Sequence, residues 1–322
     1  MIFGYTVDGG RLRAAEAPEA NLAALAWIDL ENPTREEEKA IEAALGLEVP
    51  TPAEMHEIEV SSRIYLEDGA IFMTANLPSR FDTEEPRLAP VTFILKSGRL
   101  LTLRYHQPRT FRTFVNRAER VDVGCTGGLT VMLGLLEVVI DRVADIIEAI
   151  GREIETLSRT IFRSQPRRPG DGPDYTDVLR GLGRQGDLLA GAIDSLVTLE
   201  RIIAFLSVGT VANADKDGRA RLKSAARDAR FLSDHATSLL QKLNFLLDAT
   251  LGMISIEQNN IIKIFSVAAV VFLPPTLIAS IYGMNFEVMP ELHWVGGYPF
   301  AIGLMIASAV VSYWLFKSRG WL

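Results

Sequence analysis

One side of a nearly uncharged helix near the end of the chain presents the side chains that could contact a hydrated ion. On a helical wheel of about 100° per residue, the side within about 60° of Ile262 includes Asn259, Phe265, Ala269, Leu273, Thr276, Ser280 and Gly283. The oxygens of the polar members could line a water-containing pore, which the bulky apolar members would constrict. The same stripe could instead serve helix packing alone, since small and hydroxyl residues also let membrane helices approach closely.

A pore would require several copies of this helix. A single helix cannot enclose a path for water, so the pore interpretation predicts a ring of identical chains. Pro274 and Pro275 lie inside the helix and leave the carbonyls of Val270 and Val271 without their usual amide donors. Such carbonyls are tolerated at membrane depth where neighbouring helices or water can satisfy them.

Two runs without a formal charge, residues 264–286 and 295–316, position these side chains. Each run can cross roughly 30 Å of hydrocarbon as a helix. We place the spans at about 264–284 and 297–316. The alternative is a buried helical hairpin in a soluble protein, but buried helices are rarely free of charge over such a length. The beginning of the chain has charged residues too early for the core of a signal peptide.

The charges that flank the two spans indicate their orientation. Lys263 precedes the first span, and Lys317 and Arg319 follow the second, whereas the loop between the spans contains Glu287 and Glu291 without Lys or Arg. Because Lys and Arg accumulate on the cytoplasmic side, both termini are expected in the cytoplasm.

Composition excludes several functional classes. The chain has 322 residues and is 48% apolar, enough for about two domains with a sizeable core. Its net charge of −7 argues against nucleic acid as a partner and mildly for cations. The single Cys125 allows no internal disulfide, which fits a reducing compartment. A membrane-anchored enzyme or scaffold remains the remote alternative, but it would need a polar cluster or nucleotide motif that the first third lacks.

The first region, residues 1–120, is predicted to mix helices and strands. A short apolar strand, Trp27 to Leu30, is followed by a helix that begins after Thr34, with Glu37 at the spacing of a capping box. Further strands are expected in "AIFMTANL", "APVTFILK" and "RLLTLRY", the last two joined as a hairpin at Ser97-Gly98.

The second region, residues 121–260, is predicted to be helical. Residues 128–162 repeat apolar positions every three or four residues and end at "RSQPRRPGDGP". A second helix is expected at about 175–206. A third starts near Asp215 and meets no proline before Pro274, so it would be on the order of 100 Å long if it continues into the first span.

The last third resembles the CorA family of magnesium and cobalt transporters, and its proteobacterial members in particular. The resemblance depends on "ISIEQNNIIKIFSVAAVVFLPPTLIASIYGMN", on "YGMNFEVMPEL" after the first span, on "GYPFAIGLM" in the second and on the basic end "FKSRGWL". It implies a channel of the bacterial inner membrane that is not an enzyme and has no organic cofactor. The implied architecture is an α+β cytoplasmic domain, long stalk helices and a two-span transmembrane hairpin at 261–322, assembled in membrane lipid as a homopentameric funnel. Family members transport Mg²⁺, Co²⁺ and often Ni²⁺.

This resemblance gives the triplet Gly283-Met284-Asn285 a role in selectivity. Mg²⁺ holds its octahedral water shell tightly, so a pore that captures it should bind the coordinated water. Five copies of Asn285 would offer amide oxygens for that purpose. Gly283 would let the backbone turn, through a positive φ, and bring carbonyls near the ion. Met284 would pack the turn, because thioether sulfur is a poor partner for a hard ion.

The acidic loop has two interpretations. Five copies each of Glu287 and Glu291 would raise the local cation concentration at the mouth, or both could be ordinary solvated residues. The main alternative function is that of a ZntB-like zinc transporter, either coupled or not coupled to protons. The pore stripe contains no Asp, Glu, His or Cys, which disfavours a site that chelates zinc. His293 is the one transition-metal ligand near the mouth and is expected to be a bystander.

The resemblance also implies that cytoplasmic Mg²⁺ binds between subunits and holds the pore closed. An ion that binds the closed state better shifts the population toward it. Asp248, which precedes the first span, is the best candidate ligand, and Asp228 and Asp234 on the same helix are weaker ones. Each could equally be an ordinary solvated helix charge.

Overall fold

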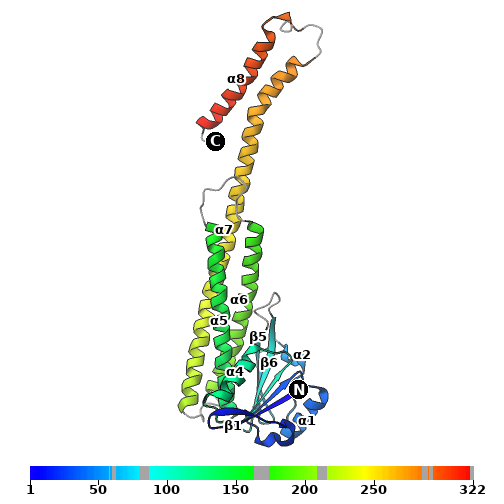
Figure 1. Cartoon of the computed structure of the whole chain (residues 1–322), viewed down its shortest axis with the longest axis vertical. Helices are drawn as coiled ribbons and strands as arrows, with labels where there is room; N and C mark the ends of the chain where they lie inside the picture. Colours follow the sequence, from blue (N-terminus) through cyan, green and yellow to red (C-terminus); the bar gives the residue numbers. More distant parts are fainter. Residues whose placement is uncertain are drawn as a thin grey trace. The chain divides into compact units, whose positions relative to one another are not determined.

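The computed structural model describes residues 1–57, 59, 63–79, 87–162, 174–208, 216–284, 289 and 293–319. The chain forms two compact units, Met1–Leu247 and Asp248–Leu322. Figure 1 shows the path of the chain, with the mixed sheet and its helices in the first unit and helices alone in the second. Helix α7, Lys216–Tyr282, contributes residues to both units.

The first unit contains a seven-stranded sheet in the order β2-β1-β3-β7-β6-β5-β4. Its strands are β1 Ile2–Asp8, β2 Arg11–Ala14, β3 Trp27–Glu31, β4 Ile64–Glu67, β5 Ala70–Ser79, β6 Arg87–Lys96 and β7 Arg99–Arg104. The pairs are antiparallel except β3 and β7, which are parallel with Glu31 opposite Arg104. The four predicted strands are confirmed, as is the hairpin at Ser97-Gly98, where both residues have positive φ.

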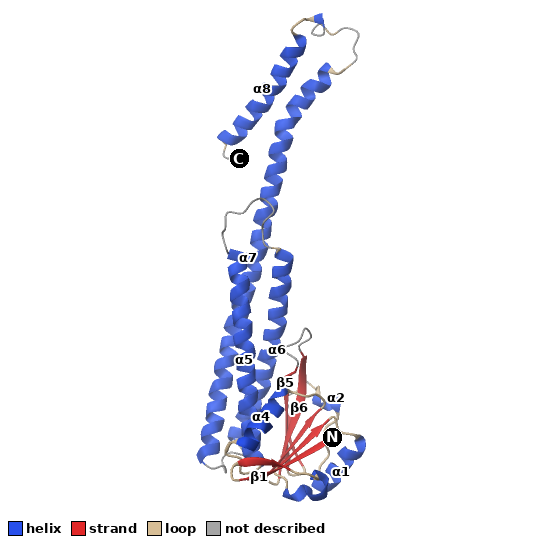
Figure 2. Ribbon diagram, viewed as in Figure 1, coloured by secondary structure: helices blue, strands red, loops and turns tan. Residues whose placement is uncertain are grey.

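Helices cover both faces of this sheet (Figure 2). The helical elements of the first unit are η1 Pro18–Ala24, α1 Arg35–Leu45, α2 Pro52–Met55, α4 Arg109–Arg120, α5 Gly128–Phe162, α6 Tyr175–Val208 and the beginning of α7. Helix α1 begins with the predicted capping box of Thr34 and Glu37 and ends at Gly46 in the left-handed conformation. The predicted long helices are confirmed to within two residues of their ends.

Two apolar layers hold the sheet between its helices. On the α1 and α2 side, Ile28, Leu30, Ile41 and Met55 belong to one buried cluster. On the opposite side Trp27 is fully buried, stacks on Tyr5 at 4.6 Å and meets Phe114 edge-on at 6.0 Å. Burial of such large side chains on both faces is the main stabilising contribution to this unit.

A buried polar network joins the parallel strands β3 and β7 on the Trp27 side. Trp27 Nε1 donates to Thr102 Oγ1 at 3.0 Å, and Thr102 donates to Asp29 Oδ1 at 2.7 Å. Arg104 Nη2 donates to Asp29 Oδ2 and to Glu31 Oε2, both at 2.7 Å. Burial raises the pKa of Asp29, and the hydrogen bond from Arg104 opposes that rise. The network therefore offsets the free-energy cost of removing the carboxylates of Asp29 and Glu31 from water.

Helix α6 is hydrogen-bonded directly to the sheet. The main-chain nitrogen of Asn76, in β5, donates to Thr198 Oγ1 at 3.1 Å, and its side-chain Nδ2 donates to Asp194 Oδ2 at 2.7 Å. These bonds lie within the extensive contact of α6 with β5. Strand β5 and helix α6 are therefore held together by hydrogen bonds as well as by packing.

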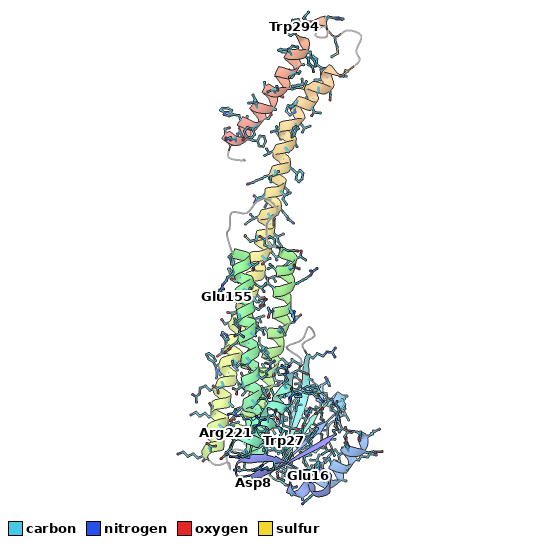
Figure 3. The ribbon with its side chains drawn as sticks, viewed as in Figure 1. Asp8, Glu16, Trp27, Glu155, Arg221 and Trp294 are labelled. Carbon is cyan, nitrogen blue, oxygen red and sulfur yellow. The ribbon has the colours of Figure 1, made fainter. Side chains whose placement is uncertain are left out.

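Ion pairs and aromatic contacts connect α7 to α5 along the first unit. Arg221 forms a two-pronged pair with Glu137, with both N–O distances at 2.8 Å. Lys242 contacts Glu155 at 2.7 Å, and Phe245 stacks on Phe162 at 6.1 Å. Figure 3 marks Arg221 and Glu155 at separate levels of the helices. Side chains of opposite charge thus fix the register of α7 against α5 at two points.

The second unit contains the remainder of α7 and helix α8, Gly297–Ser318. Both α7 and α8 are long and apolar enough to cross a membrane. Helix α7 ends at Tyr282, close to the expected end of the first span at about 264–284. Helix α8 begins at Gly297, where the second span, at about 297–316, is expected to begin.

Candidate functional site: the stripe on helix α7

The predicted stripe lies on an exposed side of α7. Ile262, Phe265 and Leu273 are 61%, 72% and 64% exposed in the single chain. The smaller members of the stripe are also exposed: Asn259, Ala269, Thr276, Ser280 and Gly283. Exposure of bulky apolar side chains beside amide and hydroxyl groups leaves this side of the helix available to something outside the chain.

The opposite side of α7 is partly covered. Its half-buried residues are Val267, Ala268, Val270, Val271, Pro274, Pro275, Ile278 and Tyr282. On α8 the least exposed positions also form one stripe, at Gly297, Ala301, Met305, Ser308, Ala309, Ser312 and Phe316. Small residues at intervals of three or four let two helices approach closely. On each helix, the less exposed residues therefore mark one side, and on α7 that side is opposite the predicted stripe.

Helix α7 continues through its two prolines. Neither Pro274 nor Pro275 has an N–H, so Val270 and Val271 lose their usual intrahelical donors. Thr276 Oγ1 donates to the carbonyl of Phe272 at 2.7 Å. That bond uses the hydroxyl hydrogen, which leaves the lone pairs of Thr276 Oγ1 on the exposed side as acceptors.

The end of α7 corrects one expectation about Gly283. Its φ is not in the left-handed region, so the predicted turn through a positive φ is wrong. Gly283 instead continues the helical bonding, with its N–H donating to the carbonyl of Ala279 at 3.0 Å. A Cβ at this position would lie 3.1 Å from the Ala279 oxygen, a tight contact with the preceding turn. Met284, which follows, is 47% exposed.

The sequence profile of the CorA-like Mg²⁺ transporter proteins matches residues 23–318. The chain belongs to the CorA-like Mg²⁺ transporter family. Two relatives described as magnesium transport protein CorA are similar over their whole length and that of this chain. The protein from Pasteurella multocida strain Pm70 is 37% identical over 323 residues, and that from Escherichia coli strain K12 is 36% identical over 325 residues. Members of this family are transporters, so the expectation that the chain is not an enzyme is confirmed.

Solved structures show the same fold. The CorA magnesium transporter from Methanocaldococcus jannaschii has a TM-score of 0.78 at 18% identity and covers 100% of this chain and 99% of its own. The full-length CmaX protein has a TM-score of 0.71 at 15% identity and covers 98% of this chain and 96% of its own. The expected order of α/β domain, long helices and paired terminal helices is therefore confirmed.

Three of the predicted mouth residues, Asn285, Glu287 and Glu291, lie outside the described residues. His293 is exposed. Next to it, the ring of Trp294 meets that of Phe300 at 5.6 Å, and the Trp294 carbonyl accepts from Gly297 N at 2.9 Å. These contacts fix the start of α8.

The candidate regulatory carboxylates all lie on the exposed surface of α7. Asp248, Asp228 and Asp234 are exposed, and Ser224 Oγ donates to Asp228 Oδ2 at 3.3 Å. Across the described residues, no three His, Cys, Asp or Glu side chains gather as a metal-binding group within one chain.

The structure also brings together acidic groups of α5 and α7 that sequence reasoning did not connect. Burial raises the pKa of Asp141; Arg117 opposes this, while Glu137, Asp145 and Asp228 add to it. No sequence signal identifies this group, because α5 and α7 are far apart in the chain. By contrast, the small-residue spacing of Gly297 and Ala301 could have indicated the buried side of α8.

Proposed function

We propose that the chain forms a homopentameric channel for hydrated divalent cations, chiefly Mg²⁺ and also Co²⁺, with Ni²⁺ as a further cargo. The membrane potential would drive uptake, because moving two charges through 100 mV is worth about 4.6 kcal/mol. Such a channel needs neither ATP nor an organic cofactor. The names of the relatives support Mg²⁺ as the transported ion.

The observation that best supports this proposal is the exposed stripe of α7, which lies opposite the half-buried side of the same helix. In a ring of five copies, the stripes would face a common axis and the α8 helices would surround them. Asn259, Thr276 and Ser280 would then offer oxygens to the water around the ion. Ile262, Phe265 and Leu273 would form apolar constrictions that close by excluding water.

Selectivity is assigned to the segment that follows the stripe. Five Asn285 amides would accept hydrogen bonds from coordinated water without the fixed charge that would trap the ion. Gly283 would keep the end of α7 close-packed, and Met284 would pack beside it. Glu287 and Glu291 would concentrate cations at the mouth.

Closure is assigned to Mg²⁺ bound between subunits on the cytoplasmic side. Asp248 is the leading ligand, and Asp228 and Asp234 are secondary ones. Carboxylates from neighbouring copies would repel each other when the ion leaves, which favours separation of the subunits and opening.

The proposed topology is that of a multi-pass protein of the bacterial inner membrane. A cytoplasmic α/β domain of residues 1–120 and a helical stalk of 121–260 would precede a pore domain of 261–322, with both termini cytoplasmic. The segment between the spans would then face the periplasm.

Ion flux into liposomes tests the function. Purified full-length protein is reconstituted, and influx of Mg²⁺, Co²⁺, Ni²⁺ and Zn²⁺ is measured with a fluorescent dye or radiotracer, with and without an imposed potential or proton gradient. We expect Mg²⁺ and Co²⁺ influx that increases with an inside-negative potential and does not respond to the proton gradient. Influx of Zn²⁺ alone, or influx that requires protons, would contradict the proposal, as would a monomer in lipid.

A further inference from the structure

Helix α8 presents exposed aromatic side chains near both of its ends. Tyr298 is exposed near the beginning of the helix, and Tyr313 and Trp314 are exposed near its end. At 1.5 Å per residue, Tyr298 and Trp314 are about 24 Å apart along the helix, comparable with a hydrocarbon core of roughly 30 Å. Tyr and Trp accumulate at both borders of that core, because each ring has an apolar body and a polar tip. The two aromatic ends of α8 therefore suit the two borders of a bilayer.

At the end of α8, a lysine shares one side of the helix with the two rings. Lys317 follows Trp314 by three residues and Tyr313 by four, so the three side chains are neighbours on the helix surface. Lys317 Nζ lies 6.0 Å from the centroid of the Tyr313 ring. A cation at this distance is attracted by the face of the ring, which holds the ammonium group beside the aromatic pair.

These three side chains have polar groups without partners of opposite charge or acceptors nearby. Among the described residues from Gln258 to the end of α7, and in 293–319, there is no Asp or Glu that could pair with Lys317. In the same part of the chain, the Trp314 indole N–H and the Tyr313 hydroxyl form no hydrogen bond. An ammonium group and two donors are therefore available to an external group that is negatively charged and accepts hydrogen bonds.

The same side of α8 continues with apolar residues toward the middle of the helix. Val310 precedes Trp314 by four residues, and Ile306 precedes Val310 by four; both are exposed. Along this side the order is therefore apolar, aromatic and cationic. A phospholipid has the matching order of acyl chain, glycerol region and phosphate. A free phosphate ion would match the cationic end alone, so the length of the surface favours a lipid.

We propose that this side of α8 binds a phospholipid with a net negative headgroup. Lys317 would pair with the headgroup phosphate, and Tyr313 and Trp314 would donate to its oxygens or to those of the glycerol region. The acyl chain would lie along Val310 and Ile306. Basic residues beside a span are attracted to anionic lipids of the cytoplasmic leaflet. The assignment to that leaflet rests on the topology of the proposed function, whereas the preference for an anionic lipid rests on α8 alone.

Retention of lipid by the purified full-length protein tests this site. The assembled protein in mild detergent is incubated with equal amounts of phosphatidylglycerol and phosphatidylcholine of the same chain length, and bound lipid is measured by native mass spectrometry. A second arm adds inorganic phosphate, which has the charge but no acyl chain. The position of a C-terminal tag in spheroplasts reports the leaflet.

The variants separate a lipid site from a general surface charge. Lys317→Gln removes the cation, Lys317→Arg keeps it, and Trp314→Leu removes the indole donor but retains apolar surface. Arg319→Gln is the matched control, because Arg319 has the same charge at the same end of α8 but lies about 200° around the helix from Lys317.

The wild type, Lys317→Arg and Arg319→Gln should all retain phosphatidylglycerol in preference to phosphatidylcholine, and phosphate should not displace it. Lys317→Gln should weaken phosphatidylglycerol binding by about fivefold, the effect expected from one basic residue near a charged headgroup. Trp314→Leu should weaken the binding of both lipids.

Equal retention of the two lipids by the wild type, displacement by phosphate, or the same loss in Arg319→Gln as in Lys317→Gln would each overturn the proposal. A tag exposed on the outside of spheroplasts would overturn the leaflet assignment. Lipid retention is measured without ion flux, so failure of the transport assay and failure of this inference are distinguishable.

Discussion

Arg104 contacts Asp29 through both Nε and Nη2, with the shortest N–O distance at 2.7 Å. Because both residues are buried, Arg104→Met would leave Asp29 and Glu31 without their cation. We expect a loss of about 3–5 kcal/mol from the stability of the α/β sheet. Hydrogen exchange of peptides from β3 and β7 measures this as lost protection.

Arg13→Met is the control for this prediction. The pair of Arg13 with Asp8 is exposed, with an N–O distance of 3.8 Å, and should contribute at most about 1 kcal/mol. Equal effects of the two substitutions would refute the role of the network.

Asn285→Ala should abolish Mg²⁺ influx in liposomes while the oligomer stays intact. The substitution removes the amide oxygens proposed to bind the water shell of the ion, without adding charge or volume. Asn260→Ala is a matched control, because Asn260 lies on α7 but on the side away from the stripe. Unchanged influx in Asn285→Ala would remove this residue from selectivity.

Leu273→Ala, and separately Phe265→Ala, should raise ion leak at high internal Mg²⁺ by widening an apolar constriction. Single-channel or flux recording measures this leak. Ile264→Ala is the control: Ile264 and Leu273 are 65% and 64% exposed in the chain, but Ile264 is on the opposite side of α7. If the leak of the Ile264 variant equals that of the Leu273 variant, the stripe is not the pore surface.

Glu37→Ala should weaken α1 in a pH-dependent manner. The backbone N–H of Thr34 donates to Glu37 and lowers the pKa of its carboxyl. Since the folded pKa is below the ordinary value of 4.5, the stabilisation is present above pH 4.5 and is lost as pH falls through the folded pKa. At neutral pH the loss should be about 0.5–1 kcal/mol, because solvent screens an exposed cap. Thermal unfolding at pH 7 and pH 3 measures it, with Glu36→Ala as control. A destabilisation that is the same at both values would contradict the assignment.

Local chemistry accounts for the parts of the fold that the sequence predicted well. The Thr34 and Glu37 spacing predicted the start of α1, and the break after Phe162 predicted the end of α5. Strands β1 and β2 were not predicted, although Gly9-Gly10, both with positive φ, is a hairpin signal between them. The Asp29–Arg104 pair could not be predicted, because its partners are 75 residues apart and meet only through the parallel register of β3 and β7.

The candidate site was also predicted only in part from the sequence. Helical periodicity placed Ile262 and Leu273 on one side of α7, because a continuous helix preserves angular order across many turns. The positive φ expected at Gly283 is absent, because its N–H continues the helical bonding to the carbonyl of Ala279. The buried side of α8 was not considered, although the small residues Gly297 and Ala301 lie on it.

The proline pair of α7 has a consequence for biogenesis. A span with two carbonyls lacking donors is poorly suited to surrounding lipid when it is alone, and association with other copies is what can supply water or neighbouring donors to those oxygens. Newly made subunits should therefore be short-lived until they assemble, and membrane quality-control proteases would remove orphans. Replacement of Pro274 and Pro275 by alanine should lengthen the lifetime of unassembled chains. The two prolines would thus make the survival of a subunit depend on its assembly with other copies.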